Sequence, residues 1–129
     1  MAAEDFPAYC EELLAHTGRV QRRRMFGGHG LYVDGLFVAI IAFERLYLKA
    51  DADTAPRFQA AGAEPFVYSA RGRTVQVNYW TAPAEAMESP AAMLPWLRLA
   101  QQAARRAQAA PAAKRAAPAA RKPRGPSPR

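Results

Sequence analysis

Apolar residues recur every three or four positions near the start of the chain and every second position soon afterwards. The first pattern, over residues 5–17, has the spacing of one helix face, with Asp5 placed to cap its start and Gly18 to end it. From Arg19 the period changes to two, which is typical of strands with one buried face. We therefore expect a helix that lies on a sheet, followed by four short strands between residues 19 and 49.

Turn signals join these strands in sequence. Asp34-Gly35 is a strong hairpin signal because both central positions of a type I′ turn need positive φ, and "AFER" at 42–45 closes the next hairpin. The stretch "GGHG" at 27–30 stands between two strand patterns and not ahead of a helix, so we interpret it as a tight turn with positive φ and bulge geometry, not as a phosphate-binding loop. The predicted turn residues are Gly27, Gly28, Gly30, Asp34 and Gly35.

A short helix is predicted next. Asp51 or Asp53 is placed to cap it, Phe58 is its expected buried anchor, and Gly62 marks its end. Two more strands follow, joined by the turn "ARGR" at 70–73.

A last helix follows Ser89-Pro90. Because Pro95 lacks a backbone N–H, the regular part of this helix is expected to begin there, after a loose turn. The order helix, four strands, helix, two strands, helix predicts an α+β fold. We expect an antiparallel sheet of about six short strands with helices packed on one side, in a single domain.

The charge of the chain is divided unevenly. Residues 1–100 carry ten Lys or Arg against eleven Asp or Glu, a balance of −1, whereas residues 101–129 carry eight Lys or Arg and no acid, a balance of +8. From Gln108 onward alanine, proline and basic residues dominate, so the segment cannot bury enough surface to offset its ordering entropy. We therefore predict a domain over 1–107 and a disordered basic tail over 108–129.

Spaced cations in this tail predict weak binding to nucleic-acid phosphates that is indifferent to sequence. The segment "RKPRGP" resembles the minor-groove core of an AT-hook, but Pro126 stands where that core has a second arginine, so specific AT recognition is not expected. The alternative is a solubilising extension of low complexity. The candidate nucleic-acid-binding residues are Lys114, Arg115, Arg121, Lys122 and Arg124.

No catalytic, cofactor or metal site is predicted. His16 and His29 are well separated, Cys10 is the single cysteine, and Glu11 and Glu12 diverge on a helix, so nothing forms a catalytic or metal-ligand constellation. The longest apolar run is far shorter than a bilayer span and the acidic start is unlike a secretory signal. We expect a cytoplasmic protein with no membrane partner.

Aromatic residues along the predicted strands are of the kind that single-strand-binding proteins use for stacking. Several alternate toward the core, however, and basic residues do not interleave with them on one face. A stacking surface here would therefore lack the cations that contact phosphates. Arg22–Arg24 is interpreted as a charged strand edge. A small-ligand-binding or enzymatic domain using the sheet face near Tyr32, Tyr47 and Arg71 is the alternative function. The aromatic residues considered are Tyr32, Tyr47, Tyr68, Tyr79 and Trp80.

Four segments carry a family resemblance: "MFGGHGLYVDGLFVAIIAFERLYLKAD", "FQAAGAEPFVY", "VQVNYWTAPAE" and "LPWLRLAQQAARRA". Over residues 13–107 the chain resembles the N-terminal domain of the TfoX/Sxy family of bacterial competence regulators. The resemblance implies a compact α+β domain with a central antiparallel sheet and no catalytic motif. For full-length members it implies activation of competence genes together with the cyclic AMP receptor protein.

Full-length members of that family continue into a second, helical domain, whereas this sequence has the basic tail in its place. We therefore expect a non-enzymatic regulatory or protein-interaction module without a cofactor. Its expected partner is a protein, with the transcription machinery as the first candidate. The tail is expected to add weak, non-specific affinity for nucleic acid.

Overall fold

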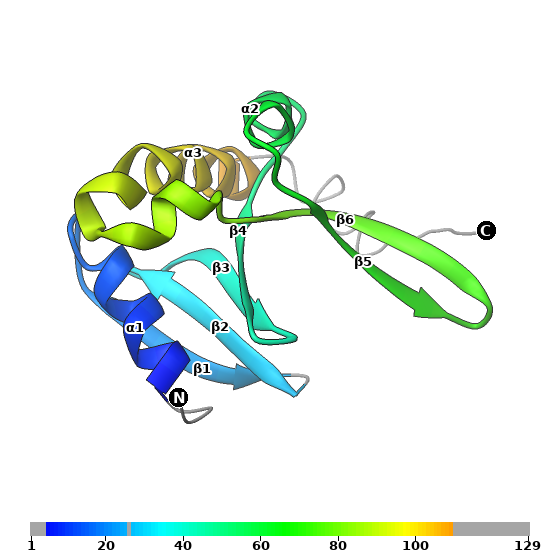
Figure 1. Cartoon of the computed structure of the whole chain (residues 1–129), viewed down its shortest axis with the longest axis horizontal. Helices are drawn as coiled ribbons and strands as arrows, with labels where there is room; N and C mark the ends of the chain where they lie inside the picture. The colour runs from blue at the N-terminus through cyan, green and yellow to red at the C-terminus, as the bar shows by residue number, and fades with distance from the viewer. Residues whose placement is uncertain (1–4, 26, 110–129) are drawn as a thin grey trace.

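A computed structural model describes residues 5–25 and 27–109 (Figure 1). Six antiparallel strands form one open sheet in the order β1-β2-β3-β4-β6-β5, accompanied by three α-helices, so the predicted α+β fold is confirmed. The elements are α1 (Asp5–Leu14), β1 (Val20–Met25), β2 (Gly28–Val33), β3 (Leu36–Ala42), β4 (Arg45–Lys49), α2 (Ala55–Ala60), β5 (Pro65–Ala70), β6 (Arg73–Thr81), the 3₁₀ helix η1 (Ala84–Glu88) and α3 (Pro90–Ala109).

The core lies between the sheet and helices α1 and α3, where α1 packs against β1 and β2, and α3 packs against β3 and β4. A bulge in β3 adds one residue to this core. Leu31 pairs with Ala39, while the next residue, Tyr32, pairs with Phe37. The extra residue, Val38, is fully buried. Cys10 is also fully buried, as a small apolar residue would be, and Phe58 anchors α2 as predicted.

The hairpin turns use positive φ at their central residues, as type I′ turns require. Asp34 and Gly35 have φ of 51° and 81°, and the Asp34 carboxylate accepts the N–H of Arg19 at 2.9 Å. Phe43 and Glu44 occupy the same conformation, with φ of 54° and 58°. Gly27, in the predicted Gly-rich turn, has φ of 79°.

The prediction of turn geometry was wrong for Gly28 and Gly30, which lie inside β2 and have no positive φ. Their function is to leave space. A Cβ on Gly28 would lie 2.1 Å from the carbonyl oxygen of Ile41, and a Cβ on Gly30 would lie 2.5 Å from Cε of Met25. Glycine here permits close packing of neighbouring strands and not a change of chain direction.

Helix α3 begins at Pro90, five residues earlier than predicted for its regular part. The Ser89 hydroxyl caps it by accepting the N–H of Ala92 at 3.0 Å. Pro95 withholds the N–H that would bond the carbonyl of Ala91, but both residues are exposed, so water can solvate that carbonyl. The helix therefore passes through the proline.

The start of α2 also differs from the prediction in detail. Thr54 occupies the N-cap position without a side-chain capping bond, and Asp51 braces the preceding turn by accepting the N–H groups of Asp53 and Thr54, each at 3.1 Å. Asp51 also accepts two bonds from the Arg106 guanidinium, at 2.6 and 3.1 Å. This ion pair ties α3 to the α2 turn.

The β5–β6 hairpin extends away from α1 and α3 (Figure 1). Strand β6 pairs with β4 only through residues 79–81, so residues 66–77 project beyond the sheet; we call them the arm. None of the helices in the described ranges is long and apolar enough to cross a membrane.

Candidate functional site

Alternate residues of each strand face away from α1 and α3, and we call this side of the sheet the open face. The bulge at Val38 and the strand register together bring aromatic residues from five strands onto it. The last turn of α3 borders the open face at one end, where Gln108 and Ala104 line a hollow of about 280 Å³ with Lys49. The aromatic residues of the open face are Tyr32, Phe37, Tyr47, Phe66, Tyr68 and Tyr79.

The inner rings of the open face pack on one another. Tyr32 and Phe37 are stacked with centroids 4.9 Å apart, and Phe37 lies 6.1 Å from Tyr79. Tyr47 meets Phe66 edge to face at 4.8 Å. Such pairs stabilise beyond their simple burial, so these rings form a firm base for the face.

The outer rings belong to the arm and to the β3–β4 turn. Phe66 lies 6.2 Å from Tyr68 and 6.0 Å from Phe43, measured between ring centroids. Phe43 is 73% exposed and Tyr68 is 43% exposed. We call Phe43, Phe66 and Tyr68 the arm patch.

Basic residues interleave with these rings, contrary to the prediction from sequence. The Arg23 guanidinium lies 5.0 Å from the centroid of Tyr32, and the Lys49 ammonium lies 5.0 Å from that of Tyr79. Alternation also puts Arg73 on this face, as well as Arg45, which pairs with Glu64, and none of the described strand positions there is Asp or Glu. Charge on the strands of the open face thus has one sign.

The predicted cluster Arg22–Arg24 is divided between the two faces of the sheet. Arg23 lies on the open face, whereas Arg22 turns toward α1 and pairs with Glu11 at 3.0 Å. Trp80 is likewise on the helix side, 7% exposed within the core, and does not contribute to a stacking surface.

Burial changes the titration of two groups on the open face. It lowers the pKa of Lys49, opposed by the nearby Asp51 carboxylate, and it raises the pKa of Tyr79, so this phenol stays protonated at neutral pH. The Lys49 ammonium donates a hydrogen bond to the Tyr79 oxygen at 3.4 Å. This contact holds the cation over the ring.

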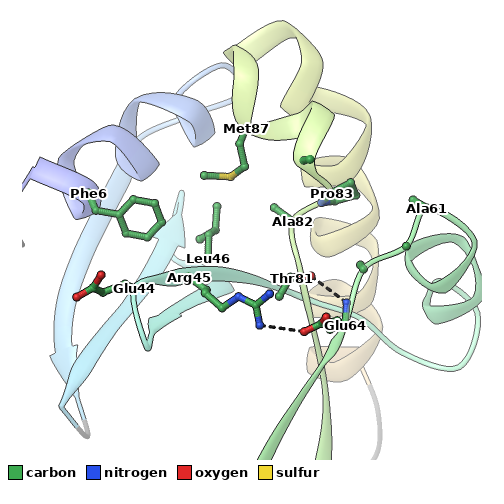
Figure 2. Close-up of a pocket in the computed structure, with 13 residues that line it drawn as sticks. Phe6, Glu44, Arg45, Leu46, Ala61, Glu64, Thr81, Ala82, Pro83 and Met87 are labelled. Atoms are coloured by element: carbon green, nitrogen blue, oxygen red, sulfur yellow. Dashed lines mark hydrogen bonds and ion pairs between the residues drawn. The ribbon is translucent and has the colours of Figure 1, made fainter. Parts of the chain in front are cut away.

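A separate cavity of about 420 Å³ lies between α1, β4 and η1 (Figure 2). Phe6, Leu46 and Met87 form its apolar wall. At its rim Arg45 pairs with Glu64 at 3.0 Å, while Glu44 lies apart from this pair (Figure 2). These polar groups do not converge on the space as they would around a bound small molecule.

The alternative prediction was a small-ligand-binding or enzymatic site near Tyr32, Tyr47 and Arg71. The structure does not bring these three residues together at one site. Tyr32 borders the hollow beside α3, Tyr47 is 5% exposed and packs against Phe66, and Arg71 is at the exposed tip of the arm.

The pKa values of Cys10 and His29 are both shifted. Burial raises the pKa of the Cys10 thiol to about 12, which leaves little nucleophilic thiolate at neutral pH. Partial burial, with Arg22 and Arg24 nearby, lowers the pKa of His29. Within the described residues, no three His, Cys, Asp or Glu side chains are grouped to hold a metal ion.

The tail residues predicted to bind nucleic acid lie outside the described residues. They are Lys114, Arg115, Arg121, Lys122 and Arg124. The last described residue of α3 is Ala109, next to Gln108 at the border of the open face.

Fold and surface together define a small α+β domain with an aromatic and basic face on an antiparallel sheet. Residues 12–104 match the TfoX N-terminal domain, so the chain belongs to that family, as the resemblance predicted. It is 28% identical over 88 residues to the DNA transformation protein TfoX1 of Aliivibrio fischeri (strain ATCC 700601 / ES114). The aligned region is 68% of this chain and 42% of that relative, so the chain spans less than half of the relative's length.

Proposed function

We propose that this chain is a non-enzymatic regulatory and interaction module that acts in the control of DNA transformation, in the cytoplasm and together with the transcription machinery. The name of the Aliivibrio fischeri relative supports a role in this process. The open face supports the mode of action, because its aromatic rings and one-signed charge form a surface suited to a partner. This face is the observation that carries the proposal.

The process is tested by transformation frequency in the source bacterium. Deletion of the gene is expected to lower the frequency and the level of competence transcripts, and the wild-type chain supplied in trans is expected to restore both. Unchanged frequency after deletion would contradict the proposed role.

The second part of the proposal concerns the tail, which adds weak and sequence-indifferent affinity for duplex DNA. Residues 101–129 carry eight basic and no acidic residues. Arg106 is engaged with Asp51, so the remaining cations are the ones available to phosphates. The tail also follows Gln108, which borders the open face.

Titration of labelled duplex DNA at several salt concentrations tests the tail. A full-length variant with Lys114, Arg115, Arg121, Lys122 and Arg124 replaced by glutamine should flatten the slope of log K against log salt by up to about 4.5, at about 0.9 per neutralised contact. The matched control replaces an equal number of tail alanines by glutamine and should keep the slope. An unchanged slope in the neutralised variant would remove the tail from the proposal.

A further inference from the structure

Phe43 combines an unfavourable backbone conformation with an exposed side chain. Its φ of 54° is unfavourable for a bulky side chain, and its ring is 73% exposed to solvent. Glycine or asparagine would make the same turn with less strain. A strained and exposed aromatic residue of this kind points to a binding role.

Phe43 is also close to other accessible rings. Phe66 stands between Phe43 and Tyr68, at 6.0 and 6.2 Å, so the arm patch presents three neighbouring aromatic rings. Val75 and Val77 lie directly opposite Tyr68 and Phe66 in the hairpin register and extend the apolar surface. The rings are tilted against one another, by 39° between Phe43 and Phe66 and by 68° between Phe66 and Tyr68.

The inner rings of the open face are less suited to contact a ligand. The Tyr32 ring has Phe37 stacked on it and the Arg23 guanidinium over it, while Lys49 covers Tyr79. These rings support the face, whereas the arm patch exposes Phe43 and Tyr68 to solvent on either side of the half-buried Phe66.

Two cations lie at the tip end of the arm patch, while Glu44 lies beside Phe43 at its other end. Arg73 lies on the same face of the arm, and Arg71 is at its tip; both are exposed, and neither forms an ion pair with another described residue. A second copy of the chain packed patch to patch would bring these like charges together, which disfavours self-association. The charge favours an anionic partner.

We propose that the arm patch binds single-stranded nucleic acid, with unpaired bases stacked on its rings and phosphates contacted by Arg71 and Arg73. Unpaired bases stack on individual exposed aromatic rings, and arginine contacts both phosphates and base planes. The bases of a duplex are already stacked on each other, so the patch discriminates against duplex DNA. This inference rests on the proposed function, since it names the partner of the same open face.

Adjacent residues of β5 provide a matched test. Tyr68 and Val67 are each 43% exposed but lie on opposite faces of the arm. Full-length Tyr68→Thr and Val67→Thr both keep a strand-forming residue. Fluorescence anisotropy of a labelled oligothymidine of about 15 nucleotides, at about 200 mM salt to weaken the contribution of the tail, measures their affinities.

Tyr68→Thr is expected to weaken binding at least about 5-fold, as loss of one stacked base would, while Val67→Thr stays within about 2-fold of wild type. Phe43→Asn should weaken binding similarly, because asparagine suits positive φ and keeps the turn. Glu44→Asn, at the neighbouring position with φ of 58°, should leave affinity unchanged or slightly higher because it removes a negative charge. Melting curves verify that each variant is folded.

Equal effects of Tyr68→Thr and Val67→Thr would overturn the proposal, as would absence of single-strand binding by the folded wild type. A change in sedimentation by Tyr68→Thr with unchanged affinity for oligothymidine would also overturn it, because the arm would then be a self-association surface. So would a Tyr68→Thr variant that loses binding to an acidic protein but keeps its affinity for oligothymidine. If duplex binding through the tail and the transformation phenotype persist in any of these cases, the proposed function stands and only the arm assignment fails.

Discussion

The two faces of the sheet use different kinds of apolar residue. On the helix side, aliphatic residues such as Leu31 and Leu48 are fully buried against α1 and α3. On the open face, their strand neighbours Tyr32 and Lys49 are half-buried and keep polar groups at the surface. Aliphatic packing maximises the area removed from water. On the open face the inner rings are covered by neighbouring rings and cations, whereas Phe43 and Tyr68 of the arm patch stay exposed. One face therefore holds the fold together and the other is suited to recognition.

The largest effect is expected on the helix side. Leu48→Ala should lower the free energy of unfolding by about 3 kcal/mol, because it removes a fully buried side chain and leaves a cavity. Tyr68→Thr on the open face should cost less than about 1 kcal/mol, since Tyr68 is already 43% exposed. Urea denaturation of both variants measures the contrast. Similar losses of unfolding free energy in the two variants would show that packing on the open face also stabilises the fold.

Gly30 tests whether close packing of the inner rings needs a missing side chain. Gly30→Ala should destabilise by about 1–3 kcal/mol, because its Cβ would meet Met25 at 2.5 Å and Phe37 at 2.9 Å. Gly28→Ala should cost more than Gly30→Ala, since its Cβ would meet the Ile41 carbonyl and not a flexible side-chain end. Thermal melting gives the order, and the reverse order would contradict the spacing role of these glycines.

Substitution of Phe43 is expected to raise the free energy of unfolding, unlike the substitutions above. Phe43→Asn is expected to raise the free energy of unfolding by about 0.5–1 kcal/mol, because it relieves a bulky residue at positive φ and removes an exposed ring. A higher melting temperature together with weaker oligothymidine binding would separate stability from binding at one residue. A lower melting temperature would mean that the ring stabilises the arm.

The smallest effect concerns the ion pair between α3 and the α2 turn. The Arg106 guanidinium lowers the pKa of Asp51. A carboxyl whose folded-state pKa is depressed contributes stability above its unfolded value of about 3.9 and loses it as the pH falls through the folded value. Arg106→Gln should therefore melt slightly below wild type at pH 7, with the difference closing in acid. Arg105→Gln is the control, and a difference that grows in acid would contradict the assignment.

Local patterns in the sequence were sufficient for the element order. Alternation predicted the strands, Asp34-Gly35 predicted its hairpin turn, and Phe58 was predicted as the buried anchor of α2. These features depend on residues close together in the chain. Capping at Ser89 overrode the local penalty of Pro95, so the start of α3 was predicted too late.

Only the tertiary structure decided the composition of the open face. The bulge at Val38 shifts the register so that Tyr32 meets Phe37, and pairing of β4 with β6 brings Lys49 to Tyr79. Phe37, Phe43 and Phe66 were absent from the aromatic residues considered in the sequence, although the alternation that includes Phe37 and Phe66 was visible within their strands. Which residues share a face across several strands depends on bulges and strand order, and these are set by long-range packing and not by neighbours along the chain.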